Sequence, residues 1–259
     1  MPGYREYVAA YCRGTTVAAL LIADPGAALA QLAPAASSLP SLSSSLGAHT
    51  LQTQSEGLGV SPVITNPITT QPRDSSLIVF NGGYLSNASA PEDSYGNHWK
   101  QLGNAVPFGN GYGDRFNVKA YVVLDAKGGP DHTIRFAKNG NAAGEISVPF
   151  IEIRQGGVLQ DVSQNYAPTG LRLSSGNVTT TGPATLIAVW WGDGGVKRMT
   201  AVPNNGFAVI DSYLMLPDNS GVQCAVAYKQ VAAAGTYNVS WAGAPAQGAI
   251  LWLLAFQSK

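Results

Sequence analysis

The sequence predicts an all-β protein: a jelly-roll-like antiparallel β-sandwich built from two similar halves and preceded by an N-terminal arm. Three observations support this fold class. Most of the chain repeats one pattern of strands twice. Its apolar runs are short and rich in Val, Ile, Tyr, Phe and Trp, as in strands. Gly, Pro, Asn and Asp, which favour turns, separate these runs. An internal repeat is informative because it restricts the folds available to the chain.

The two copies lie about 105 residues apart. Ser75–Phe80 matches Pro183–Val189, and a glycine-rich turn follows each run. His132–Phe136 in the same way matches Tyr237–Trp241. A duplicated set of strands that shares one core predicts a jelly roll in which the two sets interleave across two sheets. Two separate small sandwiches are the alternative.

Nine strands are expected where apolar runs lie between turn residues. The last run is apolar on both faces, which predicts a central strand covered on each side. A terminal strand buried in this way favours one interleaved domain. The nine expected strands are Leu77–Phe80, Phe116–Leu124, His132–Phe136, Ile146–Ile153, Thr185–Trp191, Ala208–Leu214, Val222–Gln230, Thr236–Trp241 and Ala249–Phe256.

Composition changes near residue 72, which predicts a docking arm and linker over residues 1–72 and the β-sandwich domain over residues 73–259. A short helix is expected over Tyr4–Ala23 and a second one after Asp24. The low-complexity stretch Pro34–Leu46 cannot bury itself. It is either a disordered linker or an arm that a partner orders. The apolar candidates for docking are Leu20, Leu21, Leu29, Leu32, Leu39, Leu42 and Leu46.

Charge and composition argue against some partners. Fifteen basic and fifteen acidic residues give zero net charge, and no basic run is longer than Lys197-Arg198. Binding to nucleic acid is therefore not expected. No segment reaches the roughly 18 apolar residues that a membrane span needs. Arg13–Ala30 loosely resembles a signal peptide, so secretion is an alternative. Cys12 and Cys224 lie in different regions, and Cys224 is expected to be a small core residue.

Few residues point to catalysis. His49, His98 and His132 lie far apart in the sequence and form no zinc-binding set. No phosphate loop or nucleophile elbow is present. Glu145 and Glu152, the acids tested as a glycosidase pair, bracket one expected strand with opposite parity. We expect a non-enzymatic protein without a metal or cofactor.

Binding has more support, because aromatic residues adjoin loops rich in Gly and Asn, a combination that suits sugars or a protein surface. Tyr112 lies in a seven-residue span, 108–114, with three glycines. Trp190 and Trp191 adjoin an expected strand, which favours core or edge packing. The candidate ligand or host contacts are Tyr112, Trp99, Tyr95 and Asp114.

Asp93-Ser-Tyr-Gly-Asn-His-Trp99 resembles a pattern found in jelly-roll surface proteins of tailed bacteriophages and prophages, of the head decoration, head fibre or tail fibre type. The second half is similar to the same group across Thr179–Asp193, Val202–Phe207 and Gly235–Trp241. This resemblance covers about residues 65–259. It implies a jelly-roll fold and brings no catalytic residues.

These observations predict a virion structural protein that anchors to other virion proteins through its arm and displays a β-sandwich on the virion surface. A homo-oligomer is expected, and analogy favours a trimer. The first alternative is a receptor- or carbohydrate-binding module of a tail fibre or tail tip. The second is a glycan-degrading enzyme. The copies share strand and turn residues but not charged or histidine positions, so function is expected in the loops of 84–114 and in the arm.

Overall fold

The computed structural model describes residues 45–257, apart from 85–89, 110, 156–157 and 193–194. Within these residues the chain is an antiparallel all-β sandwich, as predicted, and its one helical element is the 3-10 turn Gly113–Arg115. The first half contains β1 (Leu46–Gln54), β2 (Val63–Ile64), β3 (Ser75–Tyr84), β4 (Glu92–Asp93), β5 (Lys100–Pro107), β6 (Phe116–Ala126), β7 (Ile134–Phe136) and β8 (Ile146–Ile153). The second contains β9 (Val158–Ser174), β10 (Val178–Thr180), β11 (Ala184–Gly192), β12 (Thr200–Pro203), β13 (Ala208–Tyr213), β14 (Gln223–Val231), β15 (Gly235–Tyr237) and β16 (Ser240–Gln257).

Each half forms one large and one small sheet, and five strands of each large sheet follow one another in the same order. The first large sheet has the order β1-β8-β3-β6-β5, and its small sheet has the order β2-β7-β4. In the second half, β9, β16, β11, β14 and β13 follow one another in the same way, β12 pairs with the start of β16, and the small sheet is β10-β15. Because the chain passes repeatedly between the large and the small sheet, each half is a jelly roll in its own right.

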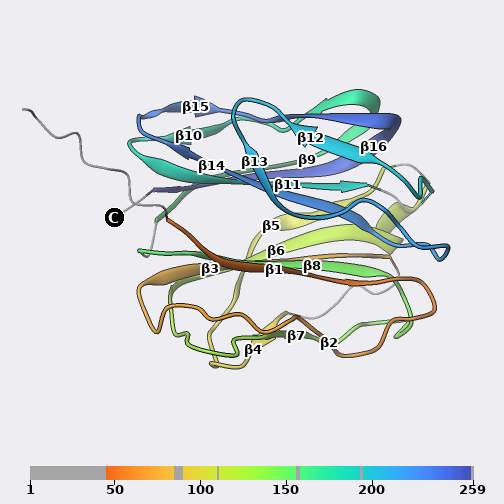
Figure 1. The fold of residues 1–259 in the computed structure, drawn as a ribbon, viewed down its shortest axis with the longest axis horizontal. Helices are drawn as coiled ribbons and strands as arrows, with labels where there is room; N and C mark the ends of the chain where they lie inside the picture. The colour runs from red at the N-terminus through yellow and green to blue at the C-terminus, as the bar shows by residue number, and fades with distance from the viewer. Residues whose placement is uncertain (1–44, 85–89, 110, 156–157, 193–194, 258–259) are drawn as a thin grey trace, which may run out of the picture. The chain divides into compact units, whose positions relative to one another are not determined.

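The expected interleaving of the two copies is therefore wrong. The first large sheet takes all its strands from the first copy, and the second large sheet takes all of its strands from the second copy. The two jelly rolls pack against each other through their large sheets, with the small sheets on the outside (Figure 1). Strands that are close in sequence are usually neighbours in space, which explains why the strands of each copy pair with one another.

Three apolar cores fill the space between these layers. One lies between the two large sheets, and each of the others lies between a large sheet and the outer strands of its own half. Central strands are therefore buried on both faces. Along β11, Trp191 points into the core between the halves and Trp190 into the outer core, and both are at most 1% exposed. The predicted central place of Ala249–Phe256 is confirmed, since this part of β16 lies between β9 and β11.

A repeated pair of hydrogen bonds shows that the copies agree in detail. The Thr65 backbone N–H donates to the Ile134 carbonyl at 2.9 Å, and the Ile134 N–H donates to Thr65 Oγ1 at 3.0 Å. In the second half, the Ser175 N–H donates to the Val239 carbonyl at 2.9 Å, and the Val239 N–H donates to Ser175 Oγ at 3.2 Å. A hydroxyl residue thus makes the same pair of hydrogen bonds at corresponding positions of the two halves.

The two halves contact each other in a pseudo-symmetric way. Edge strand β1 lies beside β13, the counterpart of β5, and His49 Nδ1 is 2.7 Å from Asp211 Oδ2. On the other side, β5 lies beside β9, the counterpart of β1, and Gln164 Nε2 donates to the Asn104 carbonyl at 3.0 Å. The same two surfaces meet twice in exchanged roles, which is the arrangement of a two-fold symmetric dimer.

A residue and its own counterpart meet in this interface. Gly82 and Trp191 each lie five residues after the leucine that opens the matching strand pattern. Gly82 pairs with Val118 and Ser147, and Trp191 pairs with the corresponding Cys224 and Ile250. A Cβ added at Gly82 would lie 2.5 Å from Nε1 of Trp191. The indole therefore occupies the space that the glycine leaves open.

The chain joins this unit earlier than residue 73. Strand β1 pairs along its length with β8, and Leu46 lies opposite Ile153 and packs against the core between the halves. Residues 45–72, assigned above to the arm, thus lie in the same packed unit as the rest. Their mostly half-buried, polar side chains explain why no strand was expected there. Leu46 is an intramolecular core contact, and the other six docking leucines lie outside the described residues.

Gly82→Ala should lower the free energy of unfolding by about 1–3 kcal/mol, because the new methyl group overpacks the contact with Trp191. In a Trp191→Leu background the same change should cost less, since the indole is gone. Gly182→Ala, beside the end of the flexible Gln257 side chain, is the matched control and should change little. Urea unfolding of the four variants measures the coupling, and purely additive costs would contradict it.

Candidate functional site

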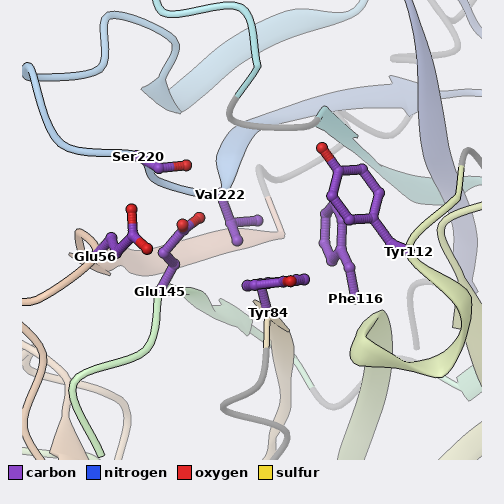
Figure 2. Close-up of a pocket in the computed structure, with 7 residues that line it drawn as sticks. All are labelled: Glu56, Tyr84, Tyr112, Phe116, Glu145, Ser220 and Val222. Atoms are coloured by element: carbon purple, nitrogen blue, oxygen red, sulfur yellow. The ribbon is translucent and has the colours of Figure 1, made fainter. Parts of the chain in front are cut away.

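A pocket of about 180 Å³ opens at one end of the interface between the two jelly rolls. The first half supplies three aromatic rings and two carboxylates, and the second half supplies two smaller side chains that complete the wall. Figure 2 shows the carboxylates on one side of the pocket, the rings of Tyr112 and Phe116 on the other, and the Tyr84 ring between them. The lining residues are Glu56, Tyr84, Tyr112, Phe116, Glu145, Ser220 and Val222.

Strand ends position the aromatic side chains. Tyr84 ends β3 and lies opposite Phe116, the first residue of β6. Tyr112 comes from the loop before β6, and its ring packs edge-on against Tyr84 at 5.7 Å and against Phe116 at 6.1 Å between centroids. Phe116 is buried, whereas Tyr84 and Tyr112 are half-buried. The rings thus form a packed corner of which the two tyrosines remain accessible.

Backbone contacts hold the two carboxylate residues at the opposite wall. Glu145 immediately precedes β8, is only 6% exposed, and accepts a backbone hydrogen bond from Tyr84 at 3.2 Å. Glu56 follows β1, and its N–H donates to the Ser220 carbonyl of the second half at 2.8 Å. Its own carbonyl accepts from Asn219 Nδ2 at 2.9 Å. Contacts between the halves therefore fix the position of Glu56.

The second half fills the corresponding place with the side chain of Tyr166. Gly248 is the counterpart of Glu145. Glu145 lies two residues before Ser147, the partner of Gly82, and Gly248 lies two residues before Ile250, the partner of Trp191. Tyr166 occupies this place. A Cβ added at Gly248 would lie 2.5 Å from the Tyr166 hydroxyl oxygen, and a Cβ added at Gly109 would lie 2.6 Å from the Tyr166 ring. The counterpart of Tyr166, judged by its pairing partner, is the much smaller Thr53. The pocket is thus a feature of one copy.

Of the predicted contact residues, the structure places Tyr112 in this pocket and the other three outside it. Asp114 is exposed in the 3-10 turn, where its carbonyl accepts from Asn117 Nδ2 at 2.9 Å. Tyr95 and Trp99 pack around the buried Asp93 and His132 under the small sheet of the first half. Trp190 and Trp191, also considered as contacts, are core residues.

Asp93 organises the segment 93–99. Its carboxylate accepts hydrogen bonds from the backbone N–H groups of Tyr95 and Asn97 at 2.9 and 3.0 Å, and from Asn97 Nδ2 and Trp99 Nε1, both at 2.9 Å. Burial alone would raise the pKa of Asp93, but the His132 side chain and these hydrogen bonds outweigh it and hold the pKa well below its ordinary value. The segment is therefore a folded turn.

Thr70, His132 and Asp93 imitate a catalytic triad. Thr70 Oγ1 is 2.8 Å from His132 Nδ1, and His132 Nε2 is 3.7 Å from Asp93 Oδ2. Thr70 is 3% exposed and His132 is completely buried. Because a nucleophile must reach its substrate, this buried row supports the fold of the first jelly roll. Thr70 Oγ1 also accepts from the Gly129 N–H at 3.2 Å.

Glu145 and Glu152 lie at opposite ends of β8. Seven residues of extended chain separate them by roughly 23 Å, too far for two acids that flank one glycosidic bond, which lie about 5–10 Å apart. Glu152 is buried and accepts from the Gln71 and Ala48 N–H groups at 2.7 and 3.0 Å and from Ser75 Oγ at 2.6 Å. Through these hydrogen bonds Glu152 connects β1 and the start of β3 to β8.

Sequence reasoning located Tyr112 but did not assign Glu56, Tyr84, Phe116, Glu145, Ser220 or Val222 to a binding site. These residues lie at the ends of different strands, and only the packing of the two halves brings them together. The repeat in the sequence sets Gly144 opposite Gly248, and only the strand pairing shows that Glu145 has Gly248 as its counterpart. An acidic residue in one copy and glycine at the matching position of the other indicate that the two positions have different roles.

Asp93→Asn should lower the free energy of unfolding at pH 7 by about 2–3 kcal/mol, because the amide weakens a buried, charge-assisted set of hydrogen bonds. Since the folded-state pKa is depressed, the stability that Asp93 supplies is present above its ordinary pKa of 3.8 and is lost as the pH falls below it. The gap between wild type and variant should therefore shrink from pH 5 to pH 2.5 in urea titrations. Glu92→Gln, an exposed neighbour paired with Arg135, is the control. An equal gap at both pH values would contradict this role.

The pocket can hold a ligand by contact with aromatic faces and by carboxylate oxygens. Among the described residues, no group of three or more His, Cys, Asp or Glu side chains could hold a metal ion, and no helix is long and apolar enough to cross a membrane. Cys224 is a buried free cysteine, as expected, and burial raises the pKa of its thiol well above the ordinary value. Comparisons with protein-family models, curated proteins and solved structures gave no match.

Proposed function

We propose that this chain is a virion structural protein of a tailed bacteriophage or prophage, which attaches to the particle through its N-terminal segment and displays two tandem jelly rolls. The observation that carries the proposal is the repeated jelly-roll topology. Jelly rolls are a recurring architecture of viral capsid and lectin domains. This warrant is fold-level analogy, and the similarity of the segment 93–99 to phage surface proteins points the same way.

The packing of the two halves suits a displayed module. Sheet edges invite association with other chains. Here β1 lies beside β13 and β5 lies beside β9. The edge strands of one large sheet thus lie next to those of the other at both sides of the interface. The apolar leucine-rich segment precedes β1 directly in the sequence. We propose that this segment binds other virion proteins and that the chain forms a homo-oligomer, with a trimer favoured by analogy.

If the leucines of the segment dock on the particle, their replacement by serine should release the protein without unfolding it. The variant carries Leu→Ser at 20, 21, 29, 32, 39 and 42 in the full-length chain, and Leu46 is kept because it packs in β1. The fraction that sediments with purified particles should fall at least about tenfold, since burial of each leucine contributes on the order of 2 kcal/mol.

The control variant replaces Leu58 and Leu171, which are 70% and 61% exposed in the β unit. It should sediment like the wild type. Circular dichroism and thermal melting should be unchanged for both variants. Equal incorporation of the arm variant and the wild type would refute docking through this segment.

A second function, recognition of a host receptor or carbohydrate at a tail fibre or tail tip, is favoured by the pocket. Two accessible tyrosine rings and two carboxylates converge there, and sugar sites combine flat apolar faces with polar groups. The counterpart in the second jelly roll is filled by Tyr166. The opening is therefore no general consequence of the fold.

Tyr112→Ala should weaken binding to host-envelope polysaccharide or host cells about tenfold, because the ring forms one wall of the pocket. Tyr95→Ala, at a predicted contact that lies outside the pocket, should leave binding unchanged. Glycan-array and cell-binding measurements on both folded variants provide the test. A clean negative for the wild type on both assays would count against recognition.

A further inference from the structure

The pocket at the end of the interface has an unusual chemical balance. Seven described residues line it: two of these are glutamates, three are aromatic, and none of the seven is basic. Glu145 contributes a carboxylate from a residue that is 94% buried, and in Figure 2 it extends into the space between Glu56 and the aromatic corner. The hydroxyl groups of Tyr84, Tyr112 and Ser220 can donate hydrogen bonds, whereas an ionised carboxylate only accepts them and attracts positive charge.

The aromatic side of the pocket attracts positive charge. The faces of Tyr84, Tyr112 and Phe116 carry the negative part of the ring quadrupole, and a cation within about 6 Å of a ring centroid is attracted to it. The chain already shows this preference, since the Arg115 guanidinium lies 5.8 Å from the Tyr84 centroid. Arg115 is not among the lining residues and leaves the pocket open.

Comparison of the two copies separates this chemistry from the needs of the fold. Where the first half has Glu145 and Thr53, the second has Gly248 and Tyr166. The second arrangement packs Tyr166 edge-on against Phe108 at 5.0 Å between centroids. In the second half the Tyr166 side chain thus takes the space beside Gly248. The first copy instead places the carboxyl group of Glu145 at the pocket.

We propose that this pocket binds an organic cation, specifically an alkylated ammonium group such as that of choline or of a methylated amine on a host-surface polymer. Glu56 and Glu145 would neutralise its charge, while the accessible rings of Tyr84 and Tyr112 hold its methyl groups. This assignment names the ligand class for the second proposed function and rests on it. It does not depend on how the protein attaches to a particle.

The test is a calorimetric and NMR titration of the full-length protein with choline and with 3,3-dimethyl-1-butanol, its neutral isostere. Choline should bind in the pocket and shift signals of Tyr84 and Tyr112, and the neutral isostere should bind at least about tenfold more weakly. Glu145→Gln and Glu56→Gln should each weaken choline binding by a similar factor. Glu56 is exposed, so the Glu56→Gln variant tests the charge without disturbing the core.

Asp114→Asn removes an exposed carboxylate near Tyr112 that does not line the pocket, and it should leave choline binding unchanged. Equal binding of the two isosteres, no binding of choline at millimolar concentration, or an equal loss in Asp114→Asn would overturn the assignment. If choline fails while Tyr112→Ala still abolishes attachment to cells, recognition at the pocket stands and only the ligand class is refuted.

Discussion

The apolar contact between the two large sheets is the constraint on which the rest of the structure depends. Each large sheet has one face covered by the small strands of its own half and the other covered by its partner. Strands such as β3, β8 and β11 are consequently apolar on both faces, and neither half could expose its inner face to water without a large loss of hydrophobic stabilisation. The two halves are therefore parts of one cooperative unit, and the pocket exists only where their ends meet.

The sequence was sufficient to predict the fold class, the repeat and the central strands, because double burial leaves unbroken apolar runs such as Ala249–Phe256. It was not sufficient to predict β1 and β9. These edge strands are mostly half-buried and polar, so neither run carries a strong apolar pattern. The allocation of copies to sheets was also missed, since the same alternation of strands and turns fits interleaved and separate jelly rolls. Tyr112 could be selected from its loop, but Glu56 and Glu145 meet through packing between distant segments.

The segment 93–99 illustrates why polar and aromatic residues in a loop need not form a binding site. Its Asp, Asn and Trp are polar or aromatic residues in a loop, the usual profile of a binding site. In the folded chain they satisfy one another: Asp93 accepts from Asn97 and Trp99, and Gly96 adopts a φ of 67° that favours glycine in the turn. Side chains committed to internal hydrogen bonds are not available to a ligand. Residues that differ between the copies are the better guide.

The contact of Gly82 with Trp191 carries a consequence for how such a protein can diversify. In a dimer of identical chains, a residue near the symmetry axis meets itself, so two glycines would leave a void and two tryptophans would collide. Covalent linkage of both halves removes this requirement, because each copy can then change independently of the other. One copy is free to become the packing partner while the other takes on a new surface. In a homodimer every substitution appears in both subunits. After tandem duplication, a substitution that favours recognition can appear in one copy while the other copy keeps the residue that packing requires.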